Sequence, residues 1–85
     1  MNGFSMEWDS DSENQLATLW LTSSDPNAVT LAQAEADRLL AQNPLGYGVE
    51  HHEGLRYLIV PPLVVWYSVD TVRRVVQVEG VAFIP

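Results

Sequence analysis

The stretch GLRYLIVPPLVVWYSVD, residues 54–70, decides the fold. Thirteen of its residues, Tyr57–Val69, follow one another without a charge, and Pro61-Pro62 interrupts them. The prolines exclude a helix through this block, and the block is shorter than the roughly 20 residues that a membrane-spanning helix needs. Proline is tolerated in turns because no ladder N–H is required there. We therefore expect an antiparallel hairpin of strands 55–60 and 63–69 that turns at the two prolines.

The second strand of this hairpin is apolar on both faces. Alternate residues of a strand point to opposite sides. The face expected under helices consists of Leu63, Val65, Tyr67 and Val69. The opposite face carries Val64 and Trp66 before Ser68, where a solvent-facing row would be polar, and this pattern indicates a surface that something covers. Either a helix end or the chain terminus covers it, or a partner does.

The segment before the hairpin predicts a short strand and a helix. Residues 3–8 alternate with Phe4, Met6 and Trp8 on one side, which is typical of a half-buried strand. Ser10 with Glu13 fits a capping box, and the acidic residues there favour a helix N-terminus. A helix over 12–21 would bury a stripe formed by Leu16, Leu19 and Trp20.

A second helix is predicted after a short break. Asp25 is placed as its N-cap and Pro26 as its first residue, where the missing N–H costs nothing. One helical face then carries Val29, Ala32, Ala36, Leu39 and Leu40. Asn43-Pro44 ends the helix, because the residue before a proline is driven out of the α region. The two helices would form a hairpin.

The remainder completes a small α+β domain. We expect a loop at 45–48 and further strands at 49–53 and 72–81, with Asp70-Thr71 as a connection. The whole chain, residues 1–85, is then a single domain: an N-terminal strand, an α-helical hairpin and an antiparallel β-sheet of three to four strands.

Charge and composition restrict the classes of function that the chain could have. The net charge is −7; residues 1–53 carry nine acidic residues against Arg38, whereas residues 54–85 have a net charge of +1. Such a balance repels phosphate backbones, so nucleic-acid binding is disfavoured except on a local arginine face. The chain lacks cysteine and shows no basic-then-apolar leader, so we expect no disulfide and a cytoplasmic location.

Four segments together resemble the RelE/ParE superfamily of small toxins. They are EWDSDSENQLATLWL (7–21), DPNAVTLAQAEADRLLAQNP (25–44), the hairpin block (54–70) and RRVVQVEGV (73–81). The resemblance spans roughly 4–81, and it implies a twisted antiparallel sheet with the α-hairpin on one face. RelE-like members cut messenger RNA in the ribosomal A site, and ParE-like members inhibit DNA gyrase. Both kinds are neutralised by an antitoxin whose peptide wraps the toxin.

The resemblance also implies where cleavage chemistry would lie. RelE-type cleavage needs basic side chains on the open sheet face, to activate a 2′-hydroxyl and to neutralise charge on the phosphate. Here Val64 stands where an arginine is expected, and the positions of two lysines fall near Arg56 and Tyr57. The last strand runs out in 81–85 without the family's arginine and tyrosine. Most of the catalytic set is therefore missing.

The remaining candidates for catalysis are Arg56, Arg73 and Arg74. A structural interpretation competes with each of them. Arg56 would pair with a nearby acid such as Glu53, and the other two would be solvated turn residues.

His51-His52-Glu53 invites a metal interpretation. Neighbouring residues of a strand point apart, so only His51 and Glu53 could share an ion, and two ligands do not hold a zinc. We expect neither a metal nor a cofactor.

These observations predict a toxin-like component of a type II toxin–antitoxin module. It would bind an antitoxin through Val64, Trp66 and Tyr57, with ribosome-dependent endoribonuclease activity left open. The alternative is a catalytically inactive structural or regulatory module with the same fold, which would form a homodimer through the sheet face.

Overall fold

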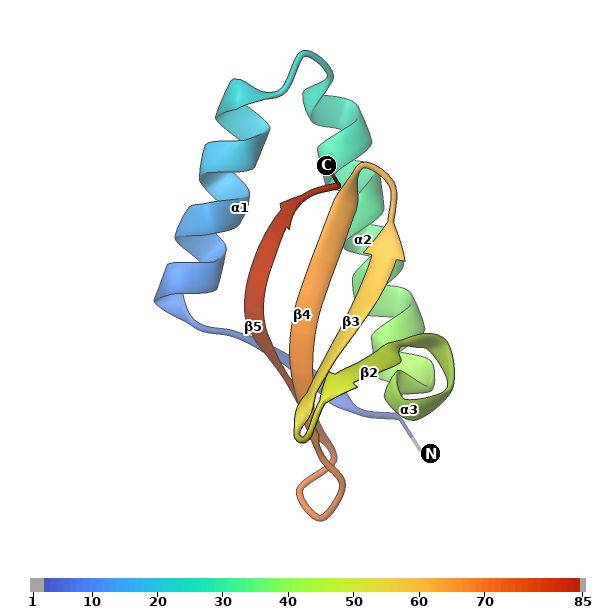
Figure 1. Cartoon of the computed structure of the whole chain (residues 1–85). Helices are drawn as coiled ribbons and strands as arrows, with labels where there is room; N and C mark the ends of the chain where they lie inside the picture. Colours follow the sequence, from blue (N-terminus) through green and yellow to red (C-terminus); the bar gives the residue numbers. More distant parts are fainter. Residues whose placement is uncertain (1–2, 85) are drawn as a thin grey trace.

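The apolar block forms the predicted hairpin at the centre of an α+β structure. The computed structural model describes residues 3–84. In chain order its elements are β1 (Ser5–Trp8), α1 (Ser10–Thr22), α2 (Pro26–Gln42), α3 (Pro44–Tyr47), β2 (Val49–His52), β3 (Leu55–Val60), β4 (Leu63–Asp70) and β5 (Val75–Phe83) (Figure 1). The prolines form the turn between β3 and β4, where Val60 lies opposite Leu63. No helix in the described part of the chain is long and apolar enough to cross a membrane.

The sheet has more strands than predicted, and one pair is parallel. Its order is β1-β5-β4-β3-β2. Strands β2 to β5 pair antiparallel with their neighbours, whereas β1 pairs parallel with β5, from Ser5 opposite Val75 to Trp8 opposite Val78. The expected sheet of three to four antiparallel strands is therefore a mixed sheet of five. The N-terminal strand joins the last strand of the chain, and this long-range pairing has no local signal in the sequence.

Both long helices begin at an aspartate. Asp9 caps α1, because its Oδ1 accepts the Ser12 N–H at 2.7 Å. This hydrogen bond also lowers the pKa of the Asp9 carboxyl. The predicted cap at Ser10 was wrong by one residue, and α1 starts earlier than 12. Asp25 caps α2 as predicted, and Pro26 is its first residue.

Two other boundaries also differ from the prediction. The expected loop at 45–48 is largely the short helix α3, because Pro44 opens it and the Asn43 side chain accepts the Gly46 N–H at 3.1 Å. The expected strand 72–81 starts only at Val75. The Asp70 carboxylate accepts two backbone N–H groups, from Val72 and Arg73, and holds residues 71–74 as a turn.

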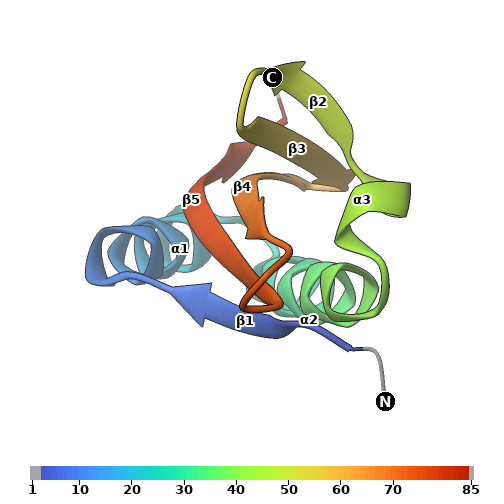
Figure 2. The same cartoon turned by 90° about the horizontal axis from the view of Figure 1, so that it is seen from below.

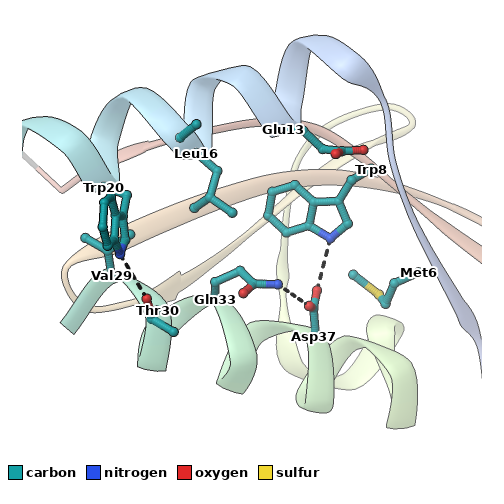
Figure 3. Close-up of a pocket in the computed structure, with 10 residues that line it drawn as sticks. Met6, Trp8, Glu13, Leu16, Trp20, Val29, Thr30, Gln33 and Asp37 are labelled. Atoms are coloured by element: carbon teal, nitrogen blue, oxygen red, sulfur yellow. Dashed lines mark hydrogen bonds between the residues drawn. The ribbon is translucent and has the colours of Figure 1, made fainter. Parts of the chain in front are cut away.

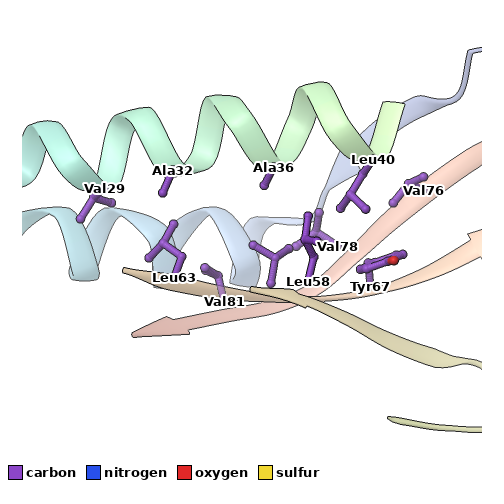
Figure 4. Close-up of a cluster of buried hydrophobic side chains, with 11 residues drawn as sticks. Val29, Ala32, Ala36, Leu40, Leu58, Leu63, Tyr67, Val76, Val78 and Val81 are labelled. Atoms are coloured by element: carbon purple, nitrogen blue, oxygen red, sulfur yellow. The ribbon is translucent and has the colours of Figure 1, made fainter. Parts of the chain in front are cut away.

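The core lies between α2 and the sheet (Figure 4). The buried face of α2 presents Val29, Ala32, Ala36 and Leu40. They meet Leu58, Leu63, Val65, Tyr67, Val76, Val78 and Val81 from the strands. The predicted helix-facing row of β4 is confirmed, and Val69 packs against the edge of this cluster.

Helix α1 lies along the outer edge of β5, beyond the end of β1. The Ser12 hydroxyl donates to the Val78 carbonyl at 3.1 Å, and the Val81 N–H donates to Gln15 Oε1 at 3.0 Å. These hydrogen bonds from α1 to the backbone of β5 cover this edge of the sheet, which blunts it.

Strand β1 is tied to α2 through Asp37. The Trp8 Nε1–H donates to the Asp37 carboxylate at 3.1 Å, and Gln33 Nε2 donates to its other oxygen. Partial burial nevertheless raises the pKa of Asp37, because desolvation outweighs these hydrogen bonds.

The raised pKa predicts a pH-dependent effect of Asp37→Asn. A folded carboxyl with a raised pKa binds its proton more tightly than the unfolded one, so ionised Asp37 opposes folding above that pKa. The asparagine variant should melt at a higher temperature than wild type at pH 7, and the gain should shrink as the pH falls through the raised pKa. Thermal unfolding at pH 7 and at a pH below the raised pKa measures the gain in melting temperature, with Glu53→Gln as an exposed control. A lower melting temperature for Asp37→Asn at pH 7 would contradict the assignment.

Candidate functional site

The sheet face turned away from α2 carries an apolar surface that no helix of the described residues 3–84 covers. Figure 2 shows β2 and β3 on the opposite side of the molecule from α1, α2 and β1. Side chains from four strands form this surface, here called the open-face patch: Val49, His51, Tyr57, Ile59, Val64, Trp66 and Ala82. Strand register puts them in rows, with Val49 beside Tyr57 beside Trp66, and Ile59 beside Val64 beside Ala82.

The centre of the open-face patch is an aromatic cluster. The ring centroids of Tyr57 and Trp66 lie 5.2 Å apart, and the His51 ring meets Trp66 edge-on at 5.1 Å. On the other side of Trp66 the partner on β5 is Gly80, which has no side chain. Tilted and edge-to-face arrangements of this kind are favourable for aromatic rings. The three side chains therefore form one continuous aromatic surface.

The structure brings together the three residues predicted for partner contact. Tyr57 and Trp66 touch directly, and Val64 lies next along β4 on the same face. Val64 and Trp66 are half-buried, but Ile59 is 52% exposed and Val49 is 54% exposed. Within residues 3–84 no helix covers this patch.

Sequence reasoning missed Val49, His51, Ile59 and Ala82 as members of the patch. Ile59 could have been predicted from the sequence, because a two-residue turn at the prolines places Ile59 opposite Val64. The irregular register of β2 between Glu50 and His52 leaves His51 without a simple alternation signal.

Arg56 lies on the covered side of the sheet. It is paired with Tyr67 across β3 and β4, on the same face as Leu58. Its Nη2 donates to the Leu45 and Gly48 carbonyls at 3.0 and 2.9 Å, and its Nε donates to the Tyr67 hydroxyl at 3.4 Å. Arg56 thus bonds to these groups in place of the Glu53 partner suggested by sequence.

Tyr67 completes this network from inside the core. The side chain is fully buried, and its hydroxyl donates to the Pro44 carbonyl at 2.7 Å. Arg56 and Tyr67 together hold α3 and the start of β2 against the end of β4.

The other two candidate arginines lie in the turn between β4 and β5. Arg73 is exposed. Arg74 adopts φ 57°, and its guanidinium lies 4.4 Å from the centre of the Phe4 ring, on the β1 side of the molecule. Its Nε also donates to the Gly3 carbonyl at 3.3 Å. The structure therefore holds Arg74 beside β1, at one edge of the sheet, and Arg56 beside α3 and the start of β2, toward the other edge.

Two solved structures have folds similar to that of this chain. The structure of the RelBE2 toxin–antitoxin complex from Mycobacterium tuberculosis contains a chain that matches with a TM-score of 0.81 and 17% identity, over 99% of this chain and 94% of that one. A chain of the chromosomal ParDE system from P. aeruginosa matches with a TM-score of 0.74 and 17% identity, over the full length of both. The protein has the RelE/ParE-like toxin fold. Neither a family model nor a curated protein sequence matches the chain.

Within this RelE/ParE-like fold, the open sheet face presents mainly apolar side chains, those of the open-face patch. Arg56 is the only one of the four arginines in a strand, and its side chain points to the other face. The patch itself contains Val64 where the resemblance implies a cation. Catalytic roles for Arg56, Arg73 and Arg74 stay predictions.

The described residues contain no group of three or more histidine and acidic side chains arranged to hold a metal ion. His51 instead packs on Trp66, as part of the aromatic cluster.

Proposed function

We propose that this protein is the toxin-like component of a type II toxin–antitoxin module and acts by binding a partner protein, the antitoxin, through the open-face patch. The observation that carries the proposal is the uncovered aromatic cluster of Tyr57 and Trp66, flanked by aliphatic side chains. Contiguous apolar surface of this kind marks protein-interaction sites, and buried aromatic residues dominate binding energies. The two structural neighbours, which come from toxin–antitoxin systems, support the same role.

The charges favour binding over RNA cleavage as the main activity. A cation that acts on a phosphate must reach it, whereas the Arg56 guanidinium is bonded to two carbonyls and a hydroxyl. The net charge of −7 slows approach to ribosomal RNA in the cytoplasm, where we expect the protein to act. An active endoribonuclease would have to assemble its site from arginines held toward opposite edges of the sheet.

Coexpression with the product of the adjacent gene tests the proposal. We expect the two proteins to copurify as a complex that survives gel filtration at micromolar concentration. Light scattering on the isolated protein addresses the alternative, a structural homodimer formed through the patch. No association between the two gene products at micromolar concentration, together with a stable dimer of this chain alone, would contradict the proposal.

Arg56→Ala separates a structural from a catalytic role. The substitution leaves the Leu45 and Gly48 carbonyls without their donor, which should lower the free energy of unfolding by about 1–3 kcal/mol. Arg73→Ala, at an exposed turn position, should change it by less than about 0.5 kcal/mol. Urea unfolding measures both, beside an assay for cleavage of ribosome-bound messenger RNA. Unchanged stability with loss of a wild-type cleavage activity would show that Arg56 is catalytic instead.

A further inference from the structure

A second apolar surface lies away from the open-face patch, between α1, α2 and β1. It is a groove of about 640 Å³, and Figure 3 shows the side chains that line it. Leu16 and Ala17 come from one wall, Val29 from the other, and Met6 from the strand. Trp8 and Trp20 stand toward its two ends (Figure 3). No residue of this groove belongs to the open-face patch.

The two indoles present ring surface to the groove. The Trp8 Nε1–H is bonded to Asp37, and the Trp20 Nε1–H donates to the Thr30 hydroxyl at 3.2 Å. Their polar atoms are therefore already used within the protein. What they offer an occupant is apolar contact and the negative face of the ring, which attracts cations.

The charges in the groove all have one sign. Glu13 and Asp37 are its only charged lining residues, and both are acidic. The one basic residue of the two long helices, Arg38, is paired with Glu35 on the surface of α2. An apolar groove with two carboxylates, two indoles and no cation in its lining is complementary to a segment that carries both aliphatic and basic side chains.

We propose that this groove docks a basic, amphipathic segment of another protein. An aliphatic side chain of that segment packs against Leu16 and the exposed ring of Trp20, and a lysine or arginine beside it meets Asp37 and Glu13. Desolvation of Asp37 strengthens such a pairing, because a bound cation relieves a carboxylate that is poorly solvated. The raised pKa of Asp37 is consistent with that environment.

Charge also excludes two other occupants of this groove, a second copy of this chain and nucleic acid. A second copy of this chain would bring its own net charge of −7 to an acidic groove. Nucleic acid would bring phosphates to Asp37 and Glu13. The inference does not depend on the proposed function, because it concerns a different surface and different residues.

The test is selection from a random 12-residue peptide library displayed on phage, with the purified full chain as target. Enriched peptides are synthesised and titrated into Trp66→Phe protein, in which the only tryptophans left are Trp8 and Trp20, so fluorescence reports the groove. We expect enriched peptides that combine lysine or arginine with aliphatic residues. Asp37→Asn should weaken their binding roughly tenfold, the size of one charge-assisted contact. Glu53→Gln removes the same charge far from the groove and should leave the affinity unchanged.

Three results would overturn the inference. The first is no enrichment, or enrichment of neutral or acidic peptides. The second is equal loss of affinity in Asp37→Asn and Glu53→Gln, which would mean that net charge alone attracts the peptides. The third is binding lost in Trp66→Ser but kept in Asp37→Asn, which would place the peptides on the open-face patch and support the proposed function alone. Circular dichroism of each variant excludes unfolding as the cause.

Discussion

Replacing Gly48 by alanine is expected to abolish most of the stability of this protein. A Cβ at this position would lie 1.7 Å from the Tyr67 hydroxyl, 2.7 Å from the ring carbon that bears it and 3.0 Å from the Tyr57 carbonyl. Tyr67 is fully buried and cannot move aside without breaking its hydrogen bond to Pro44. Overpacking usually costs about 1–3 kcal/mol, and here the lost hydrogen bonds are added, so we expect a loss of at least about 4 kcal/mol. Urea unfolding followed by circular dichroism measures it.

Gly54→Ala is the matched control for this prediction. Gly54 has φ +83° and open space around its Cβ position, so alanine there meets backbone strain without a clash. Its cost should stay near 1–2 kcal/mol. Equal losses in the two variants would contradict the assigned role of the Gly48–Tyr67 contact.

The second large effect is expected for Leu40→Ala in α2. Leu40 is 0% exposed and packs in the central cluster, and removal of its side chain leaves a cavity under the helix. Such substitutions cost about 2–5 kcal/mol. Leu31 is 71% exposed on the same helix, so Leu31→Ala makes the same chemical change outside the core and should cost less than about 0.5 kcal/mol.

Because the two leucines share a helix, the difference in helix propensity cancels between them. The free energies of unfolding of the two variants, compared by urea denaturation, therefore measure burial alone. A loss at Leu31 as large as that at Leu40 would show that the faces of α2 are assigned wrongly.

The local features of the fold were predictable where chemistry at one position decides the outcome. Pro61-Pro62 can serve only as a turn, and Asp25-Pro26 can hardly be anything other than a helix start; both predictions were confirmed. The fold class and the resemblance to RelE/ParE toxins were also confirmed. The two boundary errors have different causes. At the start of α1, Asp9 and Ser10 can both cap the helix, and Asp9 does so. At Val72, the Asp70 carboxylate binds two backbone N–H groups and turns the chain where a strand was expected.

Long-range pairing decided the features that sequence reasoning missed. Parallel pairing of β1 with β5 joins residues about as far apart as this chain allows, so no local pattern reports it. The side of Arg56 was within reach, because the two-residue turn sets the register and places Arg56 opposite Tyr67. The groove beside Asp37 could not be predicted from the sequence, because predicting it requires the relative positions of α1, α2 and β1.

The affinity of the adjacent gene's product for Trp66→Ser protein tests the central claim most directly. Val72→Ser, at a 91% exposed residue in the turn after β4, is the control for loss of an exposed hydrophobic side chain. Isothermal titration should show binding at least about thirtyfold weaker for Trp66→Ser, the effect of losing about 2 kcal/mol at a central aromatic residue, and unchanged binding for Val72→Ser. Wild-type affinity in the folded Trp66→Ser variant would show that the partner does not use the open-face patch.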